Sequence, residues 1–166
     1  MSNMVYLMTS LPSLTFGQVP PISIEEFKQD ASKQLSGRHY RALEAVDIQL
    51  LEAKQGGVKS ITSLLDDVQN DLLEVRNTKA YNRQPKLNRI PKNVIAGNPL
   101  EREQNMMKWQ WEELDSIEAG KTFTLTEVLV YKLKLQILIR LHSFNEAKGA
   151  EVLASVVNPS SGKEKK

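Results

Sequence analysis

The chain has 166 residues, with 22 Lys and Arg against 20 Asp and Glu, a formal charge of +2, 40% hydrophobic residues and no cysteine. A chain of this length can bury a core without disulfides or a structural metal, and the lack of cysteine fits a reducing compartment. The near-neutral charge argues against a general nucleic-acid binder. No apolar run reaches the roughly 20 residues that a membrane-spanning helix requires.

The amino-terminal part carries no charge over residues 1–22, so it lacks the basic start of a secretory signal. We expect an extended or irregular lead there, with a weak strand signal at residues 5–8. The first clear helix start follows, because Ser23 and Glu26 have the spacing of a capping box. A helix is therefore predicted from Ile24 to about residues 36–37.

Two further helices are predicted before the middle of the chain. The first covers residues 38–55 and stops at a Gly-Gly pair. The second begins near Ser60, where apolar residues recur at three- and four-residue steps as far as Val75. Such spacing places one apolar face of the helix against a core.

A basic connector interrupts the helical pattern. Residues 75–100 contain six bases and no acid, and prolines and a glycine make residues 84–98 an irregular connector. If the preceding helix extends far enough, Arg76, Lys79 and Arg83 share one of its faces. The six cations form what we call the basic belt, and we expect them to bind a partner: Arg76, Lys79, Arg83, Lys86, Arg89 and Lys92.

The belt admits three interpretations. It is a solvated loop, or it binds an anionic protein surface, or it binds RNA. RNA is the weakest of these because Tyr81 is the one aromatic residue nearby that could stack on a base.

A fourth helix is predicted beyond the connector, with Asn98 as N-cap, Pro99 in the first turn and Gly120 as its end. Trp109 and Trp111 lie two residues apart on it, so they are not expected to face the same core. We expect one of them, Trp111, at an edge where it contacts a partner.

A fifth helix is predicted over residues 125–148, with Gly149 as a stop or kink and a short sixth helix over 151–157. Apolar residues cover nearly its whole circumference between residues 128 and 141, which indicates burial on several sides or by a partner. A narrow polar strip remains, formed by Lys132, Gln136, Arg140 and Ser143.

These patterns predict an all-α fold, an antiparallel bundle of about five to six helices. We expect one helical domain over residues 1–157, followed by a disordered tail at 158–166.

Signatures of catalysis are missing from the sequence. His39 and His142 are isolated, and a metal bridging them would require their two helices to pack together. Residues 56–60 have a glycine pair, a lysine and a serine but lack the spacing of a phosphate-binding loop. We expect no catalytic residue, no cofactor and no metal.

Residues 127–149 (EVLVYKLKLQILIRLHSFNEAKG) resemble the late helical segment of the C/d subunit family of V/A-type rotary ATPases. Residues 46–56 (VDIQLLEAKQG) resemble the repeated helix-and-turn unit of that family. The opening YLMTSLP at residues 6–12, with PPIS and EF at 20–27, is similar to the start of an uncharacterised family encoded beside bacterial V-type ATPase subunits. The resemblance implies that Arg140 follows a tyrosine-bearing helix and contacts a partner.

The resemblance implies a non-catalytic, all-helical socket of the central stalk that links the rotating shaft to the membrane ring. Its partners would be the shaft subunits and the ring, and it would lie peripherally on the cytoplasmic face of the membrane. Members of the C/d family have three pseudo-repeated lobes in a much longer chain, so this chain has room for a reduced version. The alternatives are a free-standing assembly module, dimerising through the fifth helix, and a small RNA-binding protein.

Overall fold

A computed structural model describes the chain at residues 2–48 and 58–157, with side chains as far as residue 147. The described residues form helices and no strand, as predicted. No helix among them is long and apolar enough to cross a membrane. The elements are α1 Met4–Ser10, α2 Ile24–Gln34, α3 Gly37–Ala45, α4 Lys59–Ala80, the 3-10 helix η1 Lys92–Val94, α5 Pro99–Glu118 and α6 Leu125–Val157.

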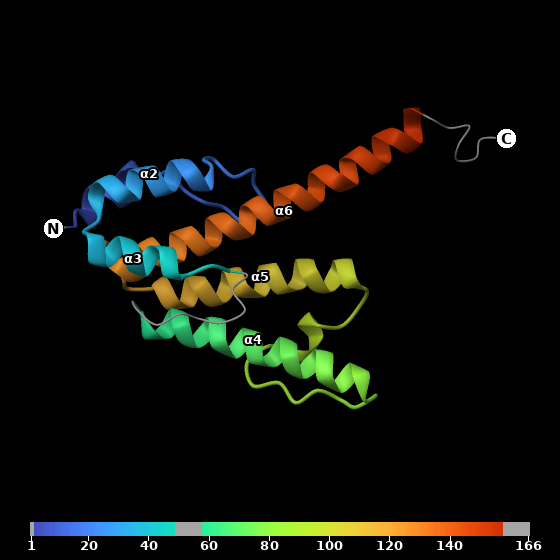
Figure 1. Ribbon diagram of the computed structural model, residues 1–166. Coiled ribbons are helices and arrows are strands. Elements are labelled where there is room, and N and C mark those ends of the chain that lie inside the picture. Colours follow the sequence, from blue (N-terminus) through green and yellow to red (C-terminus); the bar gives the residue numbers. More distant parts are fainter. Residues whose placement is uncertain (1, 49–57, 158–166) are drawn as a thin grey trace.

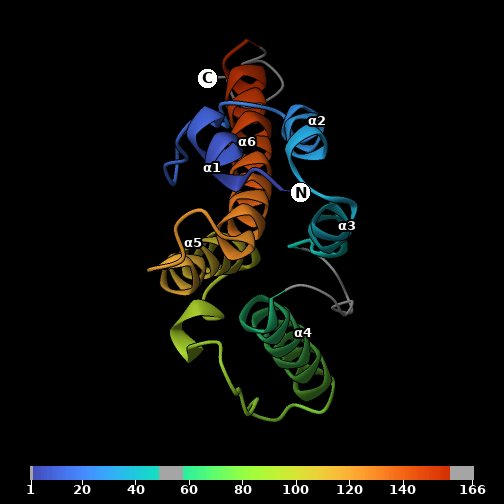
Figure 2. The same cartoon turned by 90° about the vertical axis from the view of Figure 1, so that its left-hand side faces the viewer.

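Helix α6 is the central rod of the molecule (Figure 1). Helix α1 packs on one flank of α6 and helices α2 and α3 pack on the other, while α5 makes the most extensive contact with it. Figure 2 shows α4 at the opposite end of the molecule from α1 and α2, where it contacts both α5 and α6. One hydrophobic core runs through these layers, from Leu7 on α1 to Leu141 on α6.

The capping signals set two helix starts correctly. Ser23 Oγ accepts the Glu26 N–H at 3.1 Å, and α2 begins at Ile24 as predicted. Asn98 and Glu101 form a reciprocal capping box at the start of α5, with Pro99 in the first turn. Each cap satisfies backbone N–H groups that have no partner within the helix.

The prediction for the amino-terminal residues is wrong, because residues 4–10 form helix α1 and not an irregular segment or a strand. Asn3 caps this helix by accepting the Tyr6 N–H at 3.0 Å. Leu7 is fully buried, while Val5 and Tyr6 are exposed. A helix of two turns with one buried side chain has no detectable period, so tertiary packing decides its conformation.

The second predicted helix is shorter than expected, since α3 ends at Ala45 and Val46 is extended. Residues 49–57 lie outside the described residues, and so do the predicted end of that helix, the Gly-Gly pair and much of the run 46–56. The predicted tail at 158–166 also lies outside them.

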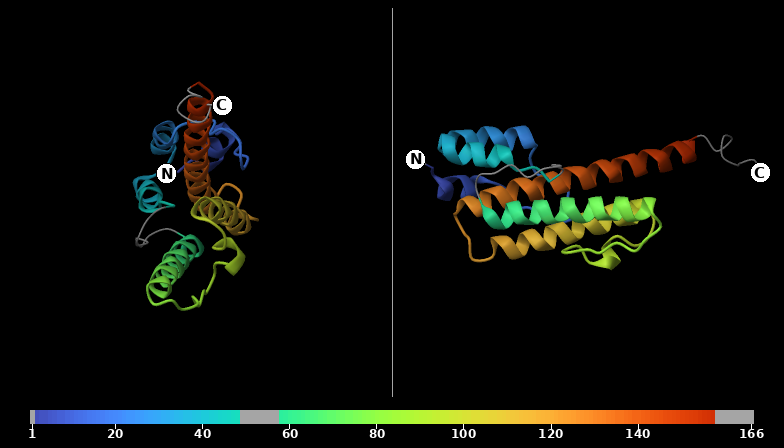
Figure 3. Two further views of the ribbon diagram at one scale, coloured as in Figure 1. Left: turned by 90° about the vertical axis from the view of Figure 1, so that its right-hand side faces the viewer. Right: turned by 60° about the horizontal axis from the view of Figure 1, so that its bottom comes forward.

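The apolar circumference of α6 is buried within the chain, which confirms burial on several sides. All residues from 128 to 135 are buried, and so are Ile137 and Leu138. The covering helices belong to this chain, so burial of residues 128–138 does not require a partner. Helix α6 does not end at Gly149, and the predicted sixth helix is its continuation to Val157. Its carboxyl-terminal end projects beyond the other helices (Figure 3).

Candidate protein-interaction site

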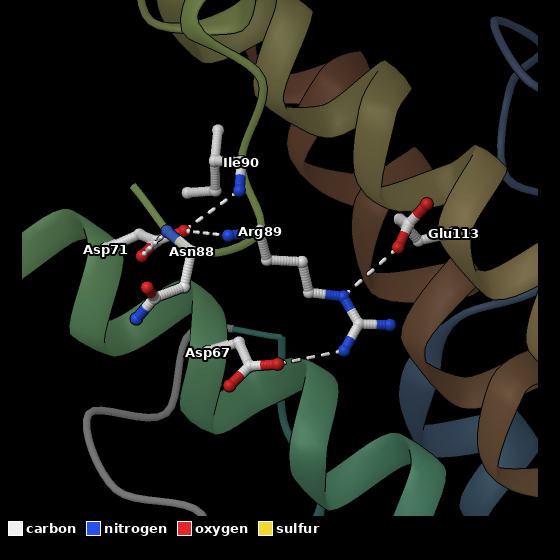
Figure 4. Close-up of polar contacts among 6 residues, drawn as sticks. All are labelled: Asp67, Asp71, Asn88, Arg89, Ile90 and Glu113. Atoms are coloured by element: carbon white, nitrogen blue, oxygen red, sulfur yellow. Dashed lines mark hydrogen bonds and ion pairs between the residues drawn. The ribbon is translucent and has the colours of Figure 1, made fainter. Parts of the chain in front are cut away.

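The connector is fastened to α4 by one buried carboxylate (Figure 4). Asp71 is 1% exposed and accepts the backbone N–H groups of Asn88 at 2.9 Å, Arg89 at 2.8 Å and Ile90 at 2.8 Å. Three such bonds offset the cost of burying the charge. The part of the connector before η1, which has no helical hydrogen bonds, is therefore held in one position against α4.

Arg89 links α4 to α5 and is not a free cation of the belt. Its Nη1 lies 3.0 Å from Asp67 Oδ2 on α4, and its Nε lies 3.1 Å from Glu113 Oε1 on α5 (Figure 4). Sequence analysis placed Arg89 among the partner-binding residues because of its charge. Its two acidic partners are more than 20 residues away in the sequence, so the sequence does not show that they pair with it. Here it holds two helices together.

The other five cations of the belt point away from the core. Lys86 lies on the connector, where its backbone N–H donates to Glu74 Oε2 at 3.0 Å. Helix α4 ends at Ala80, so the predicted shared helical face holds Arg76 and Lys79 but not Arg83. The following residues are exposed and form no ion pair with any described residue: Arg76, Lys79, Arg83, Lys86 and Lys92.

Trp111 does not lie at an exposed edge, which corrects that expectation. Trp111 is 8% exposed and Trp109 is 9% exposed. The Trp111 ring meets Phe16 edge-on, with centroids 5.5 Å apart, and Lys134 Nζ lies 4.9 Å from its centroid. Helix α5 is covered by α6 and also by the segment after α1, so two residues on different faces are both buried.

Arg140 has partners within the chain, although its side chain remains 37% exposed. Its Nη2 lies 2.9 Å from Glu103 Oε1 on α5, and its guanidinium lies 5.2 Å from the centroid of Phe144. The residue therefore joins α6 to α5 and also borders the cavity described next.

A groove of about 520 Å³ lies between α4, α5 and α6. Arg76 of α4, Arg102 of α5 and Arg140 of α6 line it, together with Glu103 and Gln110 of α5. Its apolar lining includes Leu65, Val68, Leu72, Val75, Met106 and Ile137. Arg76 is part of both the groove and the basic belt, so the two features form one continuous surface.

The sequence did not reveal this groove or the roles of Arg102 and Gln110. On α5, Arg102, Met106 and Gln110 recur at four-residue steps and so lie on one face. That pattern shows a shared face but not which helix stands opposite, and the groove exists only where the faces of three helices meet.

Lys132 is a buried cation at the carboxyl end of α3. It is 2% exposed, and its Nζ donates to the Leu43 carbonyl at 2.8 Å and to the Val46 carbonyl at 2.5 Å. Burial, the largest cause, and the nearby cation Lys28 together lower the pKa of Lys132 to about 8, against the raising effects of Asp47 and Glu44. A cation at this end of a helix satisfies carbonyls that lack helical partners.

The two histidines have separate partners. His39 Nδ1 lies 2.5 Å from Ser2 Oγ, and His142 Nε2 lies 3.6 Å from Glu146 Oε1. Among the described residues no group of three or more His, Asp or Glu is placed to hold a metal ion. The glycine pair of the run at residues 56–60 lies outside the described residues.

Comparison with known proteins identifies a family. A family model described as "protein of unknown function (DUF2764)" matches residues 66–161, more than half of the chain. The match includes most of α4, the connector, α5 and α6, and therefore nearly all of the groove and the whole basic belt. No curated protein and no solved structure matches the chain. From the extent of the family match, the chain belongs to the DUF2764 family of proteins of unknown function.

Proposed function

We propose that this chain is a non-catalytic subunit of a V/A-type rotary ATPase. It is a reduced socket of the central stalk that links the rotating shaft to the membrane ring, bound peripherally at the cytoplasmic face. The resemblance of residues 127–149 to the C/d family supplies the identity of the complex. One structural observation supports a binding role: the exposed cations of the belt lie on or beside a connector that Asp71 and Glu74 hold in place.

A fixed cationic surface suits the binding of a protein. Side chains presented from an ordered segment lose less conformational entropy on binding than those on an unanchored loop. Exposed cations also attract an acidic partner surface and orient it during encounter. The belt is therefore proposed to contact an acidic face of the shaft or of the ring.

Affinity purification from gently solubilised membranes tests this role. The tagged wild-type chain is expected to recover the catalytic, shaft and ring subunits together. Reversal of three belt charges, Lys79→Glu with Arg83→Glu and Lys86→Glu, is expected to lower that recovery about tenfold or more because like charges then face the partner. None of the three substitutions removes a side-chain ion pair within the described chain.

The matched control reverses charges on the α2–α3 side, Lys33→Glu with Arg38→Glu, where both side chains are exposed. The control is expected to recover the ATPase subunits like the wild type. Wild-type chain recovered without ATPase subunits would overturn the proposal. Recovery of RNA instead, with binding that weakens steeply as salt is raised, would favour the alternative that exposed Tyr81 suggests.

A further inference from the structure

We propose that the groove between α4, α5 and α6 binds an amphipathic helix of a partner protein, one that carries acidic residues at one end. The inference deepens the proposed function, on which it rests for the idea of a protein partner. Three features of the groove identify the occupant: the placement of its arginines, a buried amide that has no partner among the described residues, and an elongated apolar lining.

The three arginines lie at one level of the bundle. Arg89 binds both Asp67 and Glu113, so these two residues mark the same level of the antiparallel helices α4 and α5. Arg76 follows Asp67 by nine residues on α4, and Gln104 precedes Glu113 by nine residues on α5. Because the two helices are antiparallel, Arg76 lies beside the first turns of α5. Arg140 reaches the same level, because it pairs with Glu103.

The charge at this end of the groove is unbalanced. Among the described residues that line the groove, Glu103 is the one acid, and it is paired with Arg140. Arg76 and Arg102 form no ion pair with any residue that the structure describes. Two guanidinium groups beside an apolar surface favour carboxylates that bind them with paired hydrogen bonds.

The side-chain amide of Gln110 lies further along the groove. Gln110 is 7% exposed and lines the groove, yet its side chain has no hydrogen-bond partner among the described residues. A buried amide without a partner costs free energy, and buried polar side chains in proteins are generally bonded. An occupant with a polar side chain at this point would satisfy the amide.

The shape of the groove favours a helix. Its lining on α4 extends from Leu65 to Arg76, about 16 Å at about 1.5 Å per residue. A helix of about three turns covers that length and presents apolar side chains at positions i, i+3 or i+4 and i+7. Its acidic end would lie over Arg76 and Arg102, and its polar group over Gln110.

Site-specific photocrosslinking in the full-length chain tests the inference. Leu72, which lines the groove and is 36% exposed, is replaced by p-benzoylphenylalanine, and the crosslinked peptide is sequenced by mass spectrometry. The expected product is a helical segment of another protein with an apolar stripe and Asp or Glu at one end. Gln29 of α2 is exposed and far from the groove, so the same probe there is not expected to capture that segment.

Charge reversal in the groove should lower the yield of that product. Arg76→Glu with Arg102→Glu is expected to lower its yield about tenfold or more. The matched control is Lys108→Glu, an exposed cation on the same helix as Arg102 that does not line the groove. If the double reversal fails to fold, as shown by circular dichroism, Arg76→Gln with Arg102→Gln replaces it and is expected to lower the yield in the same direction.

Four results would overturn the inference: no crosslink, a crosslink within this chain, a crosslink to a second copy, or a captured segment without acidic residues. These results are separable from failure of the proposed function. ATPase subunits that co-purify equally with the groove variants would leave the proposed function standing and remove the groove inference. An acidic helix captured from a protein outside the ATPase would support the groove inference and count against the proposed function.

Discussion

At the scale of single residues, the groups that the sequence suggested for binding and those that the structure leaves available differ. Arg89 and Arg140 are engaged with Asp67, Glu113 and Glu103, and Trp111 is buried. Exposure of a charged residue depends on neighbours that are remote in sequence, so composition alone does not distinguish a free cation from a paired one. The exposed cations of the belt and the groove residue Arg102 are the candidate binding residues without an ion pair among the described residues.

Lys132 gives a prediction at this scale, because its pKa is about 8 in the folded chain and 10.5 when unperturbed. Between these pH values the unfolded chain binds more protons, so this residue makes the free energy of unfolding rise as pH increases. Urea denaturation of wild type and Lys132→Met between pH 7.5 and 9.5 measures the effect. The wild type should gain stability relative to the variant as pH rises.

The comparison between wild type and Lys132→Met cancels the titration of other groups that both proteins share. The variant should be less stable near neutral pH, because the carbonyls of Leu43 and Val46 lose their donor. Parallel pH dependence in the two proteins would contradict the account of Lys132.

At the scale of elements, the connector shows how an irregular segment becomes a defined surface. Asp71→Asn leaves one acceptor oxygen where the carboxylate provides two, and it removes the charge. We expect a loss of about 3 kcal/mol in the free energy of unfolding, since bonds to a charged group and buried donors are both affected. Amide hydrogen exchange at residues 88–90 should also become faster.

The control for the connector is Asp66→Asn, an exposed aspartate on the same helix whose side chain forms no hydrogen bond or ion pair with a described residue. We expect it to change stability by about 0.5 kcal/mol or less. Equal effects of the two substitutions would show that Asp71 does not fasten the connector.

How much of an element the sequence predicts depends on how local its determinants are. The start of α2 and the start of α5 are each set by a capping pair that spans four residues, and both predicted starts are confirmed. The conformation of α1 depends on Leu7 reaching the core, and the groove depends on Arg140 meeting Glu103, 37 residues earlier. Pairings of that kind leave no mark on a single sequence.

At the scale of the whole molecule, α6 organises the fold. Its apolar circumference is covered by helices on both sides, and the belt and groove lie on the side formed by α4 and α5 (Figures 1 and 2). Helices α1 and α2 lie at the opposite end of the molecule from α4 (Figure 2). The proposed binding surfaces therefore lie away from α1 and α2, and charge changes on those two helices are predicted to have little effect on assembly.

Native mass spectrometry of the complex purified on this chain tests the central claim most directly, because it counts subunits in an intact assembly. The account predicts particles that contain the catalytic, shaft and ring subunits together with one copy of this chain. Intact ATPase particles that lack the chain, alongside the chain in separate species, would contradict it.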